Sequence, residues 1–121
     1  MEARRVLTNE WLTIASYGDG GFRVEAARHD GSILIHREAV TAWDGALEVG
    51  RMQELARLTP PVEILIIGTG ERFDPSAAGL AAELRKIGMA VDIMATPAAC
   101  RTYNLLIGDG RVAAAALMAV P

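Results

Sequence analysis

The side chains best suited to chemistry in this sequence lie in two short stretches, 68–72 and 96–104. The candidate residues are Gly68, Thr69, Gly70, Arg72, Thr96, Cys100, Arg101 and Asn104. Each stretch follows an apolar run that predicts a strand. Ligands of open α/β sheets bind beyond the carboxyl ends of parallel strands, so neighbouring strands would bring the two stretches into one functional crevice.

Cys100 is the single cysteine and the candidate nucleophile. We expect it in the first turn of a helix, where free backbone N–H groups favour a thiolate, and the adjacent Arg101 adds positive charge. The two histidines, His29 and His36, fall in the other half of the chain with no evident approach to Cys100. An unpaired cysteine is more often a small buried apolar residue, so we favour a structural role.

Two arginines follow the predicted strands. Arg72 and Arg101 could clamp a phosphate or carboxylate over two helix N-termini. Each could equally pair with a nearby acid such as Glu71, Glu63 or Asp92. Both alternatives stay open.

The glycines at 68 and 70 resemble the opening of a dinucleotide-binding loop. However, Phe73 stands where that loop has its third glycine, and no P-loop lysine follows. A tight turn that needs positive φ at one glycine is therefore favoured. The His, Asp and Cys spacing fits no tight ligand set, so we expect neither a metal nor a cofactor.

The second half of the chain has to position these stretches. Its predicted strands are 62–67, 89–95 and 111–118, and its predicted helices run from Pro75 to Ile87 and from Pro97 to Ile107. Asp74 and Thr96 precede prolines as expected N-caps, and Gly88 provides a C-terminal stop. The order β-α-β-α-β predicts parallel strands with right-handed crossovers.

The first half has the signals of a β-meander. Residues 22–27 and 32–36 are rich in strand formers, and the Asp30-Gly31 pair between them predicts a hairpin turn. Residues 40–44 predict a third short strand, and residues 51–58 a helix of one or two turns. The sum is an α/β fold with a β-hairpin-rich N-terminal half and a β-α-β-α-β C-terminal half.

Length and composition limit the possible classes of protein. The 121 residues predict a single domain, 1–121, with 1–13 as a loose arm and 14–121 as the core. A net charge of −3 argues against nucleic-acid binding, and one cysteine excludes a disulfide framework. The longest apolar run, 112–120, is too short for a transmembrane segment, and the N-terminus lacks a signal-peptide core, so we expect a cytoplasmic protein.

Three stretches, 16–23, 64–70 and 98–106, together resemble a family of small uncharacterised bacterial proteins. That family is related to the mitochondrial complex I assembly factor 3 and to an adipogenesis-associated domain protein of animals. The Ala-Ala-Cys-Arg-Thr-Tyr-Asn run that ends at Asn104 is the most specific part. The resemblance spans residues 14–120 and implies a single three-layer α/β domain with a mixed sheet and a β-rich extension.

Two hypotheses for function follow. The resemblance implies a non-enzymatic interaction or assembly factor, linked to a respiratory complex or to membrane-protein assembly, and we favour this one. Its partner would be another protein, and a homo-oligomer is a further possibility. The alternative is a protein that binds a small anionic ligand, or a thiol-dependent enzyme, at the predicted crevice.

Overall fold

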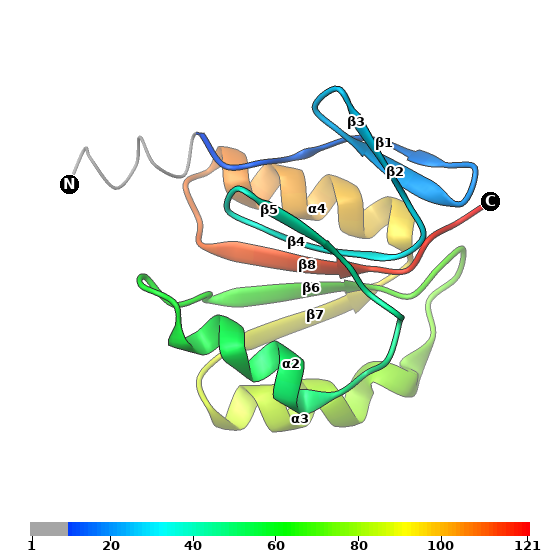
Figure 1. Ribbon diagram of the computed structural model, residues 1–121. Helices are drawn as coiled ribbons and strands as arrows, with labels where there is room; N and C mark the ends of the chain where they lie inside the picture. Colours follow the sequence, from blue (N-terminus) through cyan, green and yellow to red (C-terminus); the bar gives the residue numbers. More distant parts are fainter. Residues whose placement is uncertain (1–9) are drawn as a thin grey trace.

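The C-terminal half forms the centre of the fold. The computed structural model describes residues 10–121. Its C-terminal elements are β6 (Ile64–Gly68), η2 (Pro75–Ala77), α3 (Ala78–Lys86), β7 (Ala90–Met94), α4 (Thr96–Gly108) and β8 (Ala113–Leu117). Strand β6 pairs in parallel with both β7 and β8. The predicted β-α-β-α-β unit is therefore confirmed, and β6 and β7 are neighbours (Figure 1).

Local signals explain where the helical segment η2–α3 begins and ends. The Asp74 carboxylate accepts a hydrogen bond of 2.9 Å from the Ser76 backbone N–H, and Pro75 takes the first helical position. Gly88 follows the helix with a φ of 92°, a conformation that costs glycine little. These three residues act as the sequence predicted.

Two strands of the N-terminal half enlarge this sheet. β4 (Ile33–His36) pairs antiparallel with both β8 and β5 (Ala39–Ala42), which gives the order β5-β4-β8-β6-β7. The sheet is thus mixed, as predicted. β8 is central, and its residues 113–116 are all alanines that are at most 1% exposed.

A second sheet has three antiparallel strands in chain order: β1 (Ile14–Gly18), β2 (Gly21–Val24) and β3 (Ala27–Asp30). The tight turn between β2 and β3 lies at Glu25 and Ala26, with a φ of 54° at Glu25. The sequence instead predicted a turn over 28–31. Asp30 and Gly31 mark the passage from this sheet to β4 in the other one.

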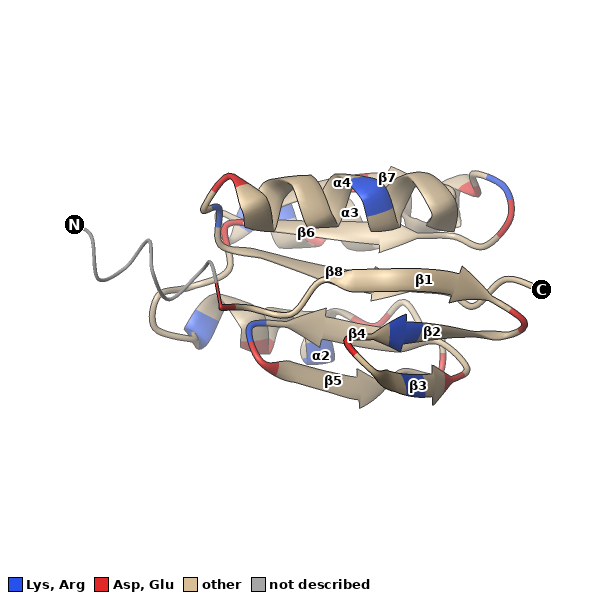
Figure 2. Cartoon of the chain, turned by 90° about the horizontal axis from the view of Figure 1, so that it is seen from above, with Lys and Arg blue, Asp and Glu red and all other residues tan. Residues whose placement is uncertain are grey.

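Apolar side chains on both faces of the five-stranded sheet create three layers (Figures 1 and 2). On one face, α2 (Val49–Gln53), η1 (Glu54–Arg57) and α3 pack over a core that includes Leu65 and Ile67. On the other face, α4 and the three-stranded sheet enclose a core that includes Ile66 and Phe22. We call these the α2/α3 face and the α4 face.

The N-terminal arm was predicted to be loose over 1–13. Residues 1–9 lie outside the described residues. Within the described part, the Leu12 backbone N–H donates to the Arg37 carbonyl at 2.7 Å, and the Arg37 guanidinium lies 4.9 Å from the centre of the Trp11 ring. This end of the arm thus contacts the turn between β4 and β5.

Candidate functional site

The loop after β6 packs against the first turn of α4. A Cβ added at Gly68 would lie 2.8 Å from the Thr96 Oγ1 and 3.1 Å from the Ala99 Cβ, so only glycine fits without a shift. Gly70 has a φ of 100°, which also favours glycine. Both glycines therefore have structural reasons to be present, as the tight-turn hypothesis expects.

Thr96 joins three segments of the chain. Its hydroxyl donates to the Met118 carbonyl at 2.7 Å and accepts from the Gly70 N–H at 2.9 Å. Its own backbone N–H donates to the Gly70 carbonyl at 2.8 Å. Thr96 was predicted to be the N-cap of α4, but the N-cap is Ala95, and the buried Thr96 side chain links loops instead.

Thr69 fixes the conformation of the loop that follows. Its hydroxyl donates to the Arg72 carbonyl at 2.6 Å and accepts from the Asp74 N–H at 3.0 Å. The closed loop presents the Arg72 side chain and Phe73 to solvent, and Phe73 is 58% exposed. No contact role was predicted for Phe73 from the sequence, although a large apolar side chain within a polar loop is a signal for an exposed contact.

Cys100 lies in the second turn of α4 and is 2% exposed. It was expected in the first turn, but the helix begins at Thr96 rather than Pro97, and the side chain faces the sheet. Burial raises the pKa of the Cys100 thiol to about 12, although the Arg101 charge acts in the opposite direction. The thiol is therefore protonated at neutral pH.

His36 is a candidate base for Cys100, but the two residues lie on opposite faces of the five-stranded sheet. Leu34 belongs to the core of the α2/α3 face, and side chains alternate along a strand, so His36 lies on that face too. Cys100 belongs to the core of the α4 face. The sheet separates the two groups, which explains why no thiol–imidazole pair forms.

Asn104 and its neighbour Tyr103 hold the N-terminal part of the chain. The Asn104 side-chain amide accepts from the Ile14 N–H and donates to the Ile14 carbonyl, both at 2.8 Å. The Tyr103 hydroxyl donates to the Leu12 carbonyl at 2.8 Å. Burial also raises the pKa of Tyr103. These polar groups are thus used to attach β1 to α4.

Arg72 and Arg101 both point to solvent. Among residues 10–121, neither lies within 4.0 Å of a carboxylate, whereas Glu63 pairs with Arg111 at 3.5 Å. The predicted crevice is therefore only partly assembled. Gly68, Thr69, Gly70 and Thr96 come together, while Cys100 and Asn104 face the interior and the N-terminal strand.

The chain is similar to a described protein family and to individual known proteins. A family described as protein of unknown function (DUF498/DUF598) matches residues 14–118. The chain belongs to this family. An uncharacterized protein from Rhodobacter capsulatus is 37% identical over 110 residues, which cover 91% of this chain and 86% of that protein.

A second relative has a described role. The NADH dehydrogenase (ubiquinone) 1 alpha subcomplex assembly factor 3 of Homo sapiens is 33% identical over 118 residues. The match covers 91% of this chain and 62% of the human protein. The chain therefore spans less than two thirds of the length of that assembly factor.

Solved structures share the fold of the DUF498/DUF598 chain. The crystal structure of a Bartonella henselae protein described as an outer membrane protein gives a TM-score of 0.75 at 30% identity, covering 93% of this chain and 98% of that one. A Rhodopseudomonas palustris protein gives 0.74 at 36% identity, covering 90% and 84%. Within residues 10–121, no helix of the present chain is long and apolar enough to cross a membrane.

Proposed function

We propose that this DUF498/DUF598 chain is a non-enzymatic assembly factor, which binds a protein subunit of a membrane-bound respiratory complex from the cytoplasm. The observation that carries the proposal is the 33% identity to the human assembly factor over 91% of the chain. That relative is named for its part in assembling NADH dehydrogenase. The proposed role of this chain rests on the domain that it shares with that relative.

The arrangement of the polar groups supports a non-enzymatic role. Thr96, Tyr103 and Asn104 use their side chains to bind other parts of the same chain. The thiol of Cys100 is buried and protonated, so it lacks the nucleophilic form. The alternative of thiol chemistry or anion binding at the crevice has less support for these reasons.

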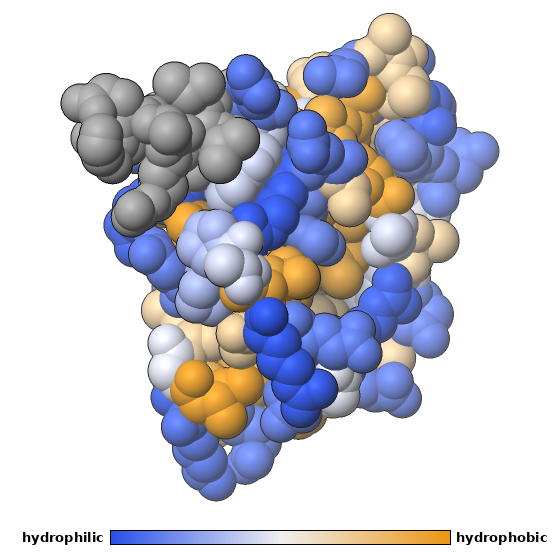
Figure 3. All heavy atoms as spheres, turned by 60° about the vertical axis from the view of Figure 1, so that its left-hand side comes forward, coloured by the Kyte–Doolittle hydropathy of each residue, from blue (hydrophilic) through white to orange (hydrophobic). Residues whose placement is uncertain are grey.

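The loop 70–73 is the surface that we propose for the contact. It is held in one conformation by the Thr69 hydroxyl, so little conformational entropy is lost when a partner binds. It presents Arg72 and Phe73, and arginine and aromatic residues are enriched at protein interfaces. The view in Figure 3, which brings the opposite end of the molecule forward, shows hydrophobic areas interrupted by hydrophilic side chains.

The test is to delete the gene in the organism that encodes the chain and to restore it as wild type or as a variant. Phe73→Ala removes the exposed ring of the loop. Leu105→Ala is the matched control, because Leu105 is 65% exposed but lies on α4 about 13 Å along the helix from Thr96. Assembled NADH dehydrogenase in membranes is measured on native gels with in-gel activity.

We expect the deletion strain to contain less assembled complex, and wild type and Leu105→Ala to restore it. Phe73→Ala should restore it poorly while the folded protein is present in normal amount. An unchanged complex in the deletion strain would contradict the assembly role. Full restoration by Phe73→Ala would contradict the contact loop alone.

A further inference from the structure

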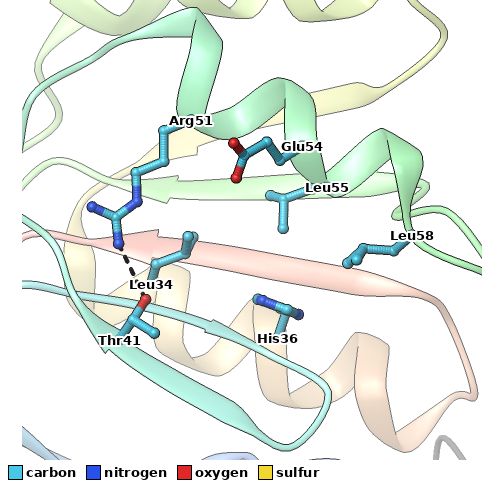
Figure 4. Close-up of a pocket in the computed structure, with 7 residues that line it drawn as sticks. All are labelled: Leu34, His36, Thr41, Arg51, Glu54, Leu55 and Leu58. Carbon is cyan, nitrogen blue, oxygen red and sulfur yellow. Dashed lines mark hydrogen bonds between the residues drawn. The ribbon is translucent and has the colours of Figure 1, made fainter.

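A pocket of about 240 Å³ lies on the α2/α3 face, between the β4–β5 hairpin and the segment α2–η1. Figure 4 shows the residues that line it, which we call the His36 pocket: Leu34, His36, Thr41, Arg51, Glu54, Leu55 and Leu58. The five-stranded sheet separates it from Cys100 and α4. It is therefore distinct from both the predicted crevice and the loop of Phe73.

The cationic group of the pocket is held in place but keeps free donors. One terminal nitrogen of Arg51 donates to the Thr41 hydroxyl at 3.2 Å and to the Ala42 carbonyl at 2.9 Å. The other guanidinium N–H groups have no hydrogen-bond partner among residues 10–121. Arg51 is exposed, and a guanidinium that two hydrogen bonds orient, with donors left free, is suited to bind a carboxylate.

A carboxylate faces the same space, and a ring nitrogen lies buried beside it. Glu54, one helical turn after Arg51, is exposed and forms no ion pair within residues 10–121. The Nδ1 atom of His36 is buried and has no hydrogen-bond partner among the described residues. A buried nitrogen without a partner is uncommon in native proteins. Desolvation and the nearby Arg37 lower the pKa of His36, so the neutral ring can accept a hydrogen bond.

The remaining lining is apolar. Leu34 and Leu55 are buried, and Leu58 is half-buried. In Figure 4 the Arg51 guanidinium lies at one end of the pocket, Leu58 lies at the other, and the Glu54 carboxylate lies between them. The volume is below the range of roughly 300–1,000 Å³ for pockets that hold drug-sized ligands, so the occupant must be small.

We propose that the His36 pocket binds a small zwitterion with an aliphatic side chain, of the size and chemistry of an apolar α-amino acid. The ligand carboxylate pairs with Arg51, and its ammonium group donates to Glu54. The aliphatic part lies against the leucines. This site goes beyond the proposed assembly role and does not depend on it.

The test is a titration of the ¹⁵N-labelled full chain, followed by amide chemical shifts. The probes are the free L-amino acids valine, leucine, isoleucine and methionine. Two analogues of leucine each lack one charge: 4-methylpentanoate has no ammonium group, and 3-methylbutylamine has no carboxylate. We expect saturable shifts in β4, β5 and α2–η1 with at least one amino acid, and binding about tenfold or more weaker for both analogues.

Three variants locate the binding. In Arg51→Gln, leucine should bind no more tightly than 3-methylbutylamine, which lacks the carboxylate. In Glu54→Gln, leucine should bind no more tightly than 4-methylpentanoate, which lacks the ammonium group. Arg57→Gln is the control, since Arg57 is exposed on η1 and does not line the pocket, and it should bind as wild type does.

Absence of saturable shifts for all four amino acids up to about 10 mM would overturn the proposal. Equal binding of the single-charge analogues would also overturn it, because the zwitterion would then not be recognised. Shifts that leave the pocket untouched, or that persist in both Arg51→Gln and Glu54→Gln, would assign the binding elsewhere and have the same consequence.

Discussion

The two faces of the five-stranded sheet use polar side chains in opposite ways. On the α4 face, Tyr103, Asn104 and the adjoining Thr96 bind backbone atoms that are distant in the sequence. On the α2/α3 face, the Glu54 carboxylate has no ion pair and the His36 Nδ1 no hydrogen bond among residues 10–121. The first arrangement stabilises the fold, and the second leaves polar groups without a partner in the protein. Residues in a distinctive motif can therefore be structural, while less distinctive residues form the pocket.

The largest effect that would test this comparison concerns Cys100. Because burial raises its pKa to about 12 from 9.0, the thiolate fraction near neutral pH should fall about a thousandfold. Ellman's reagent should react with the folded protein far more slowly than with the protein in urea. Rapid reaction of the folded protein would show that the α4 face contains an active thiol, and the contrast between the faces would fail.

Asn104→Ala should lower the free energy of unfolding by about 2–3 kcal/mol, because the Ile14 N–H and carbonyl both lose their partner. Urea unfolding measures the loss, and faster hydrogen exchange of the Ile14 amide would locate it. Arg101→Ala is the control on the same helix. Arg101 is exposed, so its removal should change stability by no more than about 0.5 kcal/mol. Equal losses in the two variants would contradict the structural role of Asn104.

His36→Leu should raise the free energy of unfolding, whereas Asn104→Ala lowers it. The change removes a buried nitrogen without a partner and adds apolar surface beside Leu34, so stability should rise by about 1 kcal/mol. Urea unfolding measures this change in the ligand-free protein. A clear loss of stability would mean that the His36 ring contributes to the fold as Asn104 does, and the two faces would then be alike.

The smallest effect is a pH dependence from His36. Desolvation, assisted by the Arg37 charge, lowers its pKa below 6.5, so the unfolded chain binds the proton more tightly than the folded one. The stabilising contribution is complete above about pH 6.5 and is lost as the pH falls from there through the lower folded-state pKa. Unfolding of wild type and His36→Leu, compared from neutral to acidic pH, should show a steeper decline for wild type. Parallel curves would refute the shift.

Part of the candidate site could be predicted because its determinants are local. Gly70 and Gly88 adopt positive φ, and Asp74 with Pro75 begins a helix, each from its own residue type and immediate neighbours. The hydroxyl of Thr96 illustrates the limit. Its position before a proline predicts an N-cap, but the chosen partners, Gly70 and Met118, are 26 and 22 residues away.

No pattern in the sequence predicts the His36 pocket. His36 stands in a short strand, while Arg51 and Glu54 stand in a helical segment with ordinary spacing. Only the packing of that segment over β4 and β5 makes them neighbours. The three-stranded sheet could not be predicted from local signals either. The turn at Glu25 and Ala26 has no strong turn residue. Asp30-Gly31 is a strong hairpin signal, but here it joins two sheets.

The sequence by itself determined the elements of the C-terminal half, their parallel pairing and the ends of the segment η2–α3, since periodicity, caps and crossover handedness act over short distances. Tertiary structure alone decided which partner each polar side chain finds. Asn104 reaches Ile14 across 90 residues, and Cys100 becomes a buried thiol because α4 turns that side toward the sheet. Such contacts depend on the register of whole elements, which no local pattern specifies.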